Sequence, residues 1–277
     1  MQIRFRWILV LLISVTVSCT TSRRAGSASK DDGKLELVLV QVNDVYEIAP
    51  ISGGKAGGMA RVATVKKEHK RENANTFLVM AGDFVSPSVY NSLTYQGNRI
   101  RGKQMIEAMN VAGTDLAIFG NHEFDVTETE LQERINESSF QWISSNSFHK
   151  KNDTTKTFEK FFGNNATEFP QTWILSLTDP DGTAVKVGFL GITLPFNKAD
   201  YVDYTDPIAT AENLYNQIKD SCDAVIALTH QFIEEDIMLA ERLPGLAIIL
   251  GGHEHDMRLE KAGKVLITKA HANAKSA

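Results

Sequence analysis

The sequence predicts an α/β fold built in layers, and three observations favour it. Short apolar runs recur along the chain, segments with helical apolar spacing lie between them, and two runs flank a tight-turn sequence. Strands that alternate with helices are typical of sheets covered by helices. The chain has 277 residues, of which 43% are hydrophobic. This is enough for one substantial core, so we expect one large domain.

Five apolar runs are expected to form strands that are covered on both faces. Each is nearly continuous in Val, Ile, Leu and Ala, which is typical of buried parallel strands. The runs are residues 35–42, 76–81, 115–119, 222–229 and 246–250. Two further runs, 172–177 and 185–192, flank the turn sequence Asp179-Pro180-Asp181-Gly182 and predict an antiparallel hairpin.

Helices are expected between these strands. Apolar side chains recur at helical spacing in residues 59–70 and 103–110, and residues 213–220 and 234–242 complete the set. Thr127-Glu128-Thr129-Glu130 fits a capping box, in which a threonine precedes the first turn and a glutamate follows three residues later. The polar stretch 150–163 is predicted to be an exposed loop.

The first residues have the form of an export signal. Arg4 and Arg6 precede a short uncharged run that is too short to span a bilayer comfortably. The sequence before Cys19 also resembles a bacterial lipoprotein signal, although Thr16 stands where such signals usually carry leucine. Two outcomes stay open: a cleaved signal peptide over residues 1–18, or a lipid anchor on Cys19. Both predict an exported protein, periplasmic or at the cell surface.

Residues 19–34 are rich in Ser, Thr, Lys, Asp and Gly, which predicts a flexible tether before a folded domain at 35–277. The net charge is −5, and loss of the leader removes two arginines and no acid, which leaves −7. A nucleic-acid partner is disfavoured, because such a surface needs clustered Lys and Arg. With Cys19 cleaved off or acylated, Cys222 is the remaining thiol, so no intrachain disulfide is expected.

A polar motif follows each of the five predicted buried strands. The motifs are Asn43-Asp44, Gly82-Asp83, Gly120-Asn121-His122-Glu123, His230 and Gly251-Gly252-His253-Glu254-His255-Asp256. Residues just beyond the carboxyl ends of strands line one shared crevice. Their carboxylates, amides and imidazoles are ligand types that Zn, Mn and Fe accept. Each residue alone has a structural explanation, such as a turn or a core histidine, but five coincidences at one position favour a metal site.

In these motifs the sequence resembles the calcineurin-like metallophosphoesterases and, within them, the catalytic domain of the 5′-nucleotidase family. The likeness covers about residues 35–277 and rests on Asn43-Asp44, Ala81-Gly82-Asp83, Gly120-Asn121-His122-Glu123-Phe124-Asp125, Ala227-Leu228-Thr229-His230 and the Gly251 to Asp256 motif. It implies a layered αββα sandwich of mixed sheets flanked by helices. Members commonly continue into a C-terminal substrate-binding domain, which we expect to be absent here, in a fragment or a single-domain enzyme.

The resemblance also implies two divalent or mixed-valence metal ions, with Zn, Mn, Fe and Mg as candidates. It assigns Asp83 as the bridge, Asp44 and His255 to one ion, and Asn121, His230 and His253 to the other. A bridging carboxylate keeps two cations about 3.5 Å apart, so that a shared water loses a proton and can attack phosphorus.

In the family's pattern the histidine of the Asn-His-Glu motif faces the scissile phosphate, and here this residue is His122. Asp125 could bond the far ring nitrogen and raise the basicity of His122. The alternative is that Asp125 only precedes the helix at Thr127.

One position departs from the family's pattern. A second ligand usually follows two residues after the first aspartate, as Asp-x-His, whereas this chain has Asp44-Val45-Tyr46-Glu47. Tyr46 could bind metal as a phenolate, which favours a hard trivalent iron, or the first site is short of one ligand. The third alternative is a tyrosine packed outside the site.

The resemblance implies hydrolysis of a small-molecule phosphate ester, with 5′-nucleotides first and 2′,3′-cyclic nucleotides or nucleotide sugars next. The alternatives are a general metallophosphoesterase acting on another substrate and a surface binding module with weakened catalysis. Retention of the polar set disfavours the binding module, because a polar crevice is costly to desolvate.

Overall fold

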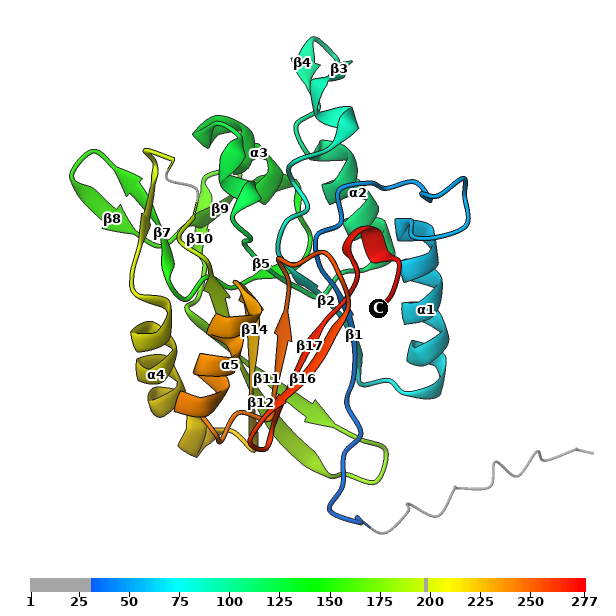
Figure 1. Cartoon of the computed structure of the whole chain (residues 1–277), viewed down its shortest axis with the longest axis vertical. Coiled ribbons are helices and arrows are strands. Elements are labelled where there is room, and N and C mark those ends of the chain that lie inside the picture. Colours follow the sequence, from blue (N-terminus) through cyan, green and yellow to red (C-terminus); the bar gives the residue numbers. More distant parts are fainter. Residues whose placement is uncertain (1–30, 197–198) are drawn as a thin grey trace, which may run out of the picture.

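The computed structural model describes residues 31–196 and 199–277. The predicted leader, Cys19 and the tether up to residue 30 lie outside the described residues. Two central sheets are packed face to face, with helices on both outer sides (Figure 1). The expected α/β sandwich is therefore confirmed. No helix in the described ranges is long and apolar enough to cross a membrane.

The first sheet is entirely parallel and has the order β1-β2-β5-β6. Its strands are β1 (Val38–Val42), β2 (Thr76–Ala81), β5 (Leu116–Ile118) and β6 (Gln141–Trp142). The helices on its outer side are α1 (Met59–Glu72), α2 (Lys103–Ala112) and α3 (Glu128–Glu137). Between β2 and α2, the short hairpin of β3 (Thr94–Tyr95) and β4 (Asn98–Arg99) projects from the top of the molecule in Figure 1.

The second sheet is mixed and has the order β11-β12-β14-β15-β17-β16. Its strands are β11 (Thr172–Thr178), β12 (Ala184–Thr193), β14 (Ala224–His230), β15 (Ile248–Gly251), β16 (Arg258–Ala262) and β17 (Val265–Lys269). The outer strands β11 and β16 are antiparallel to their neighbours, and the four between them are parallel. The outer face carries α4 (Pro207–Ile218) and α5 (Ile233–Arg242).

Three hydrophobic layers hold these four layers of structure together. Met105 and Leu78 belong to the core between the first sheet and its helices. Leu239 belongs to the core under α4 and α5. Ile118 and Phe189 lie in the third core, where the inner faces of the two sheets meet. Strands buried on both faces explain why the five apolar runs lack polar alternation.

Most predicted elements are present. The five runs contain strands, the hairpin pairs β11 with β12, and the capping box at Thr127 is made, with its hydroxyl accepting from the backbone N–H of Glu130. The expected helix at 213–220 starts earlier, because Asp206 caps it and Pro207 occupies its first turn.

The prediction of a loop at 150–163 is wrong. This region contains the end of β7 (Ser147–Lys151) and the short strands β8 (Thr154–Lys156) and β9 (Glu159–Phe162). All pairings are antiparallel: β7 pairs with β8 and with β13 (Val202–Tyr204), and β9 pairs with β10 (Asn165–Glu168). These hairpins are mostly exposed, so no apolar face reveals them in the sequence. The remaining elements are short 3₁₀ turns at Val89–Ser92, His122–Asp125, Lys219–Ser221 and Ala272–Ala274.

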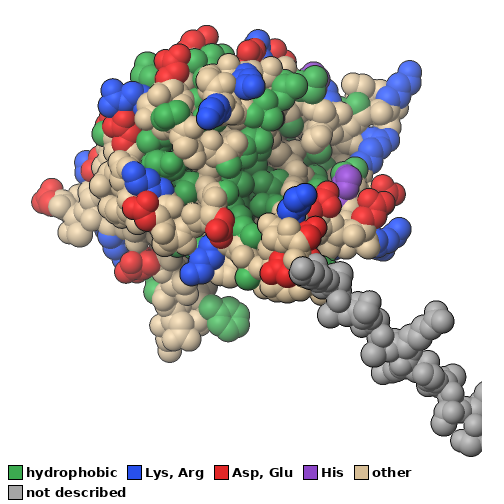
Figure 2. Space-filling view, turned by 90° about the horizontal axis from the view of Figure 1, so that it is seen from below, with side chains coloured by type: hydrophobic (Ala, Val, Ile, Leu, Met, Phe, Trp, Pro, Cys, Tyr) green, Lys and Arg blue, Asp and Glu red, His purple; other side chains and the backbone are tan. Residues whose placement is uncertain are grey.

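Figure 2 shows the molecule from the end where β1 begins. Lys and Arg side chains on this face are interspersed with Asp and Glu around a hydrophobic middle. The charge on this face is therefore mixed rather than gathered by sign.

Candidate metal centre

The carboxyl ends of strands from both sheets meet at one point. Asp44 follows β1, Asp83 follows β2, and His230 ends β14 of the second sheet. One ligand atom from each of these three residues lies within 4.8 Å of the others, and all three side chains are buried. The structure therefore brings together donors that are separated by up to 186 positions in the sequence, between Asp44 and His230.

The turns that present these side chains have unusual backbone conformations. Four of the predicted ligands have positive φ: Asp44 (52°), Asp83 (58°), His253 (93°) and His255 (64°). Such angles are unfavourable for residues other than glycine and persist only when the surroundings enforce them. Four such residues at one site indicate that the turns are shaped to aim side chains inward.

Glu123 is the residue that enforces the turn at Asp83, and the sequence analysis gave it no role. Its buried carboxylate accepts hydrogen bonds from the backbone N–H groups of Asp83, Phe84, Val85 and Gly120, at 2.6–2.9 Å. Burial and the nearby Asp83 raise the pKa of Glu123 to about 7, against the effect of these amides. Its place in the Gly-Asn-His-Glu motif was the available signal.

Gly120 is required by a close approach. A Cβ atom at this position would lie 2.2 Å from Oδ1 of Asp83. Only glycine lets the turn after β5 pack against this carboxylate.

His230 is oriented like a metal-binding imidazole. Its Nδ1 lies 2.7 Å from the carbonyl oxygen of Ala81, so Nδ1 carries the proton and donates. Nε2 then faces Asp83 Oδ2 at 3.1 Å and Asp44 Oδ1 at 3.8 Å, in positions that do not form a hydrogen bond. Burial lowers the pKa of His230, but the two aspartates outweigh burial and raise it to about 10.

Asn121 and His253 adjoin this group. Asn121 is buried, and its Oδ1 has no hydrogen-bond partner in the described part of the chain. The His253 ring meets the His230 ring edge-on, with centroids 5.4 Å apart, and Phe232 contacts its other side at 4.4 Å. Burial, helped by His230, lowers the pKa of His253, which favours the neutral imidazole that a metal ligand requires.

Asp44, His255 and Tyr46 form the outer part of the site. The His255 side chain is 53% exposed, and its Nε2 lies 3.3 Å from Asp44 Oδ1. The Tyr46 hydroxyl lies inside this cluster, within 3.1 Å of Asp44, Asp83 and His255. Burial and then the two aspartates raise the pKa of Tyr46 far above its usual range when no cation is present.

His122 and Asp125 lie at the rim and contact each other. His122 Nδ1 is 2.6 Å from Asp125 Oδ2, and the His122 backbone N–H donates to Asp83 Oδ1 at 2.8 Å. The hydrogen bond to Asp125 raises the pKa of His122, and burial opposes this rise. All nine predicted site residues therefore lie in or beside one cluster.

The donor set fits a cation site. Buried carboxylates, imidazoles and an amide oxygen converge, and two of the buried polar atoms, Asn121 Oδ1 and His230 Nε2, lack a hydrogen-bond partner among the described residues. A buried polar atom without a partner is costly unless a cation or water contacts it. Asp44, Asp83, Asn121, His230, His253 and His255 would hold the metal.

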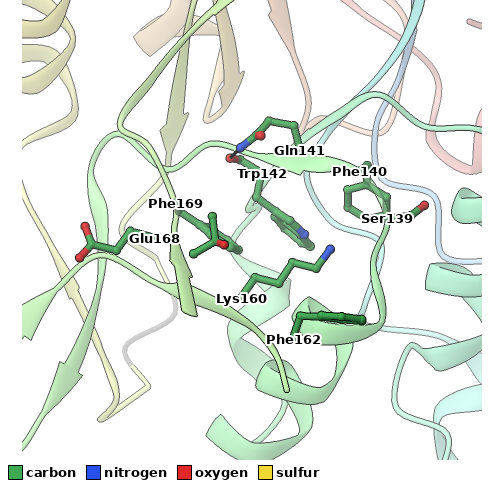
Figure 3. A pocket seen from close by; sticks show the side chains of 9 residues that line it. Ser139, Phe140, Gln141, Trp142, Lys160, Phe162, Glu168 and Phe169 are labelled. Carbon is green, nitrogen blue, oxygen red and sulfur yellow. Dashed lines mark hydrogen bonds between the residues drawn. The ribbon is translucent and has the colours of Figure 1, made fainter. Parts of the chain in front are cut away.

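Another hollow lies away from this site. It has a volume of about 390 Å³ and is lined by aromatic side chains, including Phe140, Trp142, Phe162 and Phe169 (Figure 3). The Lys160 ammonium beside it donates to the carbonyl oxygen of Ser138. None of the predicted site residues lines this pocket.

The sequence model of the calcineurin-like phosphoesterase family matches residues 37–257. The chain belongs to this family. Among curated relatives, it is 26% identical over 271 residues to Protein 5NUC of Lutzomyia longipalpis, covering 89% of this chain and 43% of that protein. It is 25% identical to snake venom 5′-nucleotidase of Gloydius brevicauda, covering 88% of this chain and 40% of that protein. The chain thus spans less than half the length of these relatives.

Solved structures of other proteins have the same fold. The calcineurin-like phosphoesterase YfkN of Bacillus subtilis superposes with a TM-score of 0.67 at 21% identity, covering 86% of this chain and 81% of that one. The NAD nucleotidase of Haemophilus influenzae gives a TM-score of 0.70 at 19% identity, covering 86% of this chain and 51% of that one. The predicted resemblance and fold are confirmed.

Proposed function

We propose that the chain is a metal-dependent phosphoesterase that hydrolyses phosphate monoesters, with 5′-nucleotides as the first substrate class. The observation that carries this proposal is the convergence of Asp44, Asp83 and His230 from two sheets, with a buried imidazole nitrogen facing two carboxylates. A polar cluster of this kind is expensive to bury unless it binds a charged group.

The contacts support a division of the ligands between two cations. Oδ2 of Asp83 lies 3.1 Å from both the Tyr46 hydroxyl and His230 Nε2, so this oxygen is placed to contact both cations. Asp44 and His255 would hold the first cation, and Asn121, His230 and His253 the second. When bound, the cations would lower the pKa of a water and neutralise charge on the phosphoryl oxygens.

His122 is suited to proton transfer at the leaving oxygen. Its backbone is tied to Asp83, and Asp125 holds Nδ1, so Nε2 is the nitrogen that can donate. The hydrogen bond to Asp125 raises the pKa of His122, which favours the protonated imidazole that a general acid needs. The ring is partly exposed, which leaves it open to a substrate entering from solvent.

The names of the relatives support nucleotides as substrates. Several curated relatives are called 5′-nucleotidases, including those of snake venom and of human, and one structural neighbour is an NAD nucleotidase. Because the chain spans only part of those proteins, the substrate class rests on their names and on the shared catalytic fold.

Export belongs to the same proposal. A leader over residues 1–18 or a lipid on Cys19 would place a domain of residues 35–277 outside the cytoplasm. Mass spectrometry of the mature amino terminus distinguishes these cases, since a lipid adds mass to Cys19. An intact Met1 terminus would contradict both.

Phosphate release tests the activity directly. The purified chain is incubated with 5′-AMP and with a chromogenic phosphodiester, with Mn²⁺, Zn²⁺ or Mg²⁺ and with a chelator. We expect metal-dependent turnover of AMP. Turnover of the diester alone would replace the nucleotidase assignment with a general phosphoesterase, and no metal-dependent turnover of either would favour a binding module.

A further inference from the structure

We infer that Tyr46 is a ligand of the first cation through its phenolate oxygen. This inference rests on the proposed function and adds a donor to the same site. The Tyr46 oxygen lies 3.1 Å from Asp44 Oδ1, 3.1 Å from Asp83 Oδ2 and 2.9 Å from His255 Nε2. These three atoms are the ones that would hold the first cation.

The spacing of these atoms matches a shared coordination shell. Donor atoms bound to one Zn²⁺ or similar ion at about 2.1 Å lie roughly 3.0–3.5 Å from one another. The Tyr46 contacts measure 2.9–3.1 Å, and His255 Nε2 lies 3.3 Å from Asp44 Oδ1. The phenol oxygen is therefore placed as one more vertex around the same point.

The supply of protons argues against a purely hydrogen-bonded cluster. A phenol has one proton, and ionised carboxylates only accept. The Tyr46 oxygen contacts a carboxylate oxygen of both Asp44 and Asp83, so one proton has to serve two contacts. A cation among these oxygens would remove this shortage, because it would attract the phenol oxygen and both carboxylates together.

The backbone around Tyr46 is held in place. The N–H groups of Tyr46 and Glu47 both donate to the side-chain oxygen of Asn273, at 2.9 and 3.1 Å. The Asn273 N–H in turn donates to the carbonyl oxygen of Asp44 at 2.8 Å. The Tyr46 ring also meets the His255 ring edge-on, with centroids 5.4 Å apart. The phenol is thus presented to the cluster by several independent contacts.

A phenolate is a hard, anionic oxygen donor, unlike the neutral imidazole of the family's pattern. Carboxylate and phenolate oxygens together favour a trivalent ion such as Fe³⁺ over softer divalent ions. The departure at position 46 thus changes the preferred cation of the first site rather than emptying it.

The test is spectroscopic. The cation-free protein is loaded with Fe³⁺, and its iron content and visible absorption are measured. We expect a phenolate-to-iron charge-transfer band that disappears in Tyr46→Phe and persists in Tyr95→Phe, a control at an exposed tyrosine on the β3–β4 hairpin. Tyr46→His should bind iron without the band, because it supplies an imidazole in place of the phenolate.

A second measurement, with Zn²⁺, tests the inference if the protein binds Fe³⁺ too weakly for the first. Zn²⁺ is titrated while tyrosine ionisation is followed by ultraviolet difference absorption, and the signal should depend on Tyr46. Loss of Tyr46 should weaken zinc binding by more than the about 10–100-fold expected for an outer-shell partner. Bound metal without either signal, or signals that persist in Tyr46→Phe, would overturn the inference. If metal-dependent AMP hydrolysis is intact in that case, the proposed function stands without it.

Discussion

The carboxylates of Asp44 and Asp83 are both buried, and neighbouring residues offset the free-energy cost of burying their charges. Burial alone would raise the pKa of Asp44, but the charge of His230 and hydrogen bonds involving His255 and Asn43 outweigh it and hold the pKa well below its usual range. The same carboxylates raise the pKa of His230, so the imidazole and the two acids stabilise one another's charged forms.

Asp83 and His122 should fail in different ways when replaced. Asp83→Ala removes the carboxylate that we propose as the bridge between two cations, so we expect loss of bound metal and of activity. His122→Ala should keep the metal and lower kcat by about 10²–10⁴, the range for a lost general acid. Metal analysis of the purified variants, together with kcat, separates the two. Equal loss of metal in both would contradict the assigned roles.

The pH profile should report on His122 and Asp125. A general acid works while protonated, so activity is present below the pKa of His122 and is lost as the pH rises through it. The hydrogen bond that His122 donates to Asp125 raises that pKa, so Asp125→Asn should move the loss of activity to lower pH. The measurement is kcat against pH at saturating Mn²⁺. An unmoved basic limb would show that Asp125 does not act through this histidine.

The loops after the strands are built by backbone hydrogen bonds to buried side chains. The Glu123 carboxylate accepts hydrogen bonds from four backbone N–H groups in the turns after β2 and β5. The Asn43 side chain donates to the carbonyl oxygen of Ala270, after β17, and accepts from its N–H. Lys269 has a similar role, because its buried ammonium contacts Asp236, Glu254 and the carbonyl oxygen of Gln231. These contacts fix the turns in which the ligands have positive φ.

Glu123→Gln should loosen the turn at Asp83. A glutamine has one acceptor oxygen and presents an NH₂ group to the remaining amides, and each unpaired buried amide costs about 1–3 kcal/mol. We expect a lower free energy of unfolding in urea and roughly 10–100-fold weaker metal binding. Glu107→Gln, at an exposed surface ion pair, is the matched control and should change little. Equal effects of the two substitutions would exclude the role given to Glu123.

Some elements could be predicted and others could not. Buried parallel strands show as unbroken apolar runs, so β1, β2, β5, β14 and β15 were found. The exposed strands β7 to β10 were missed, since their pairing depends on backbone partners and not on an apolar face. The early start of α4 was signalled by Asp206-Pro207 but was not recognised.

Both sheets contribute residues to the candidate metal centre, so a bound cation should stabilise the packing of one sheet on the other. Asp44 and Asp83 extend from the first sheet, and His230, His253 and His255 from the second. A cation at one hundred times its Kd should add about 2.7 kcal/mol to the free energy of unfolding. Thermal unfolding with and without Mn²⁺ measures this gain. Asp83→Asn should lose it, and an equal gain in that variant would indicate binding elsewhere.

The sequence alone predicted which residues are the candidate metal donors and that they follow buried strands. This was possible because apolar runs and turn-forming residues are local properties of the sequence. The sequence did not predict which sheet each strand joins. It also did not predict the burial of Glu123 or the contacts of the Tyr46 hydroxyl. They depend on how the inner faces of two sheets pack, with Ile118 against Gly191 and β14 against β2 and β5. That packing joins residues far apart in the sequence, and only the folded chain sets the distances on which the chemistry depends.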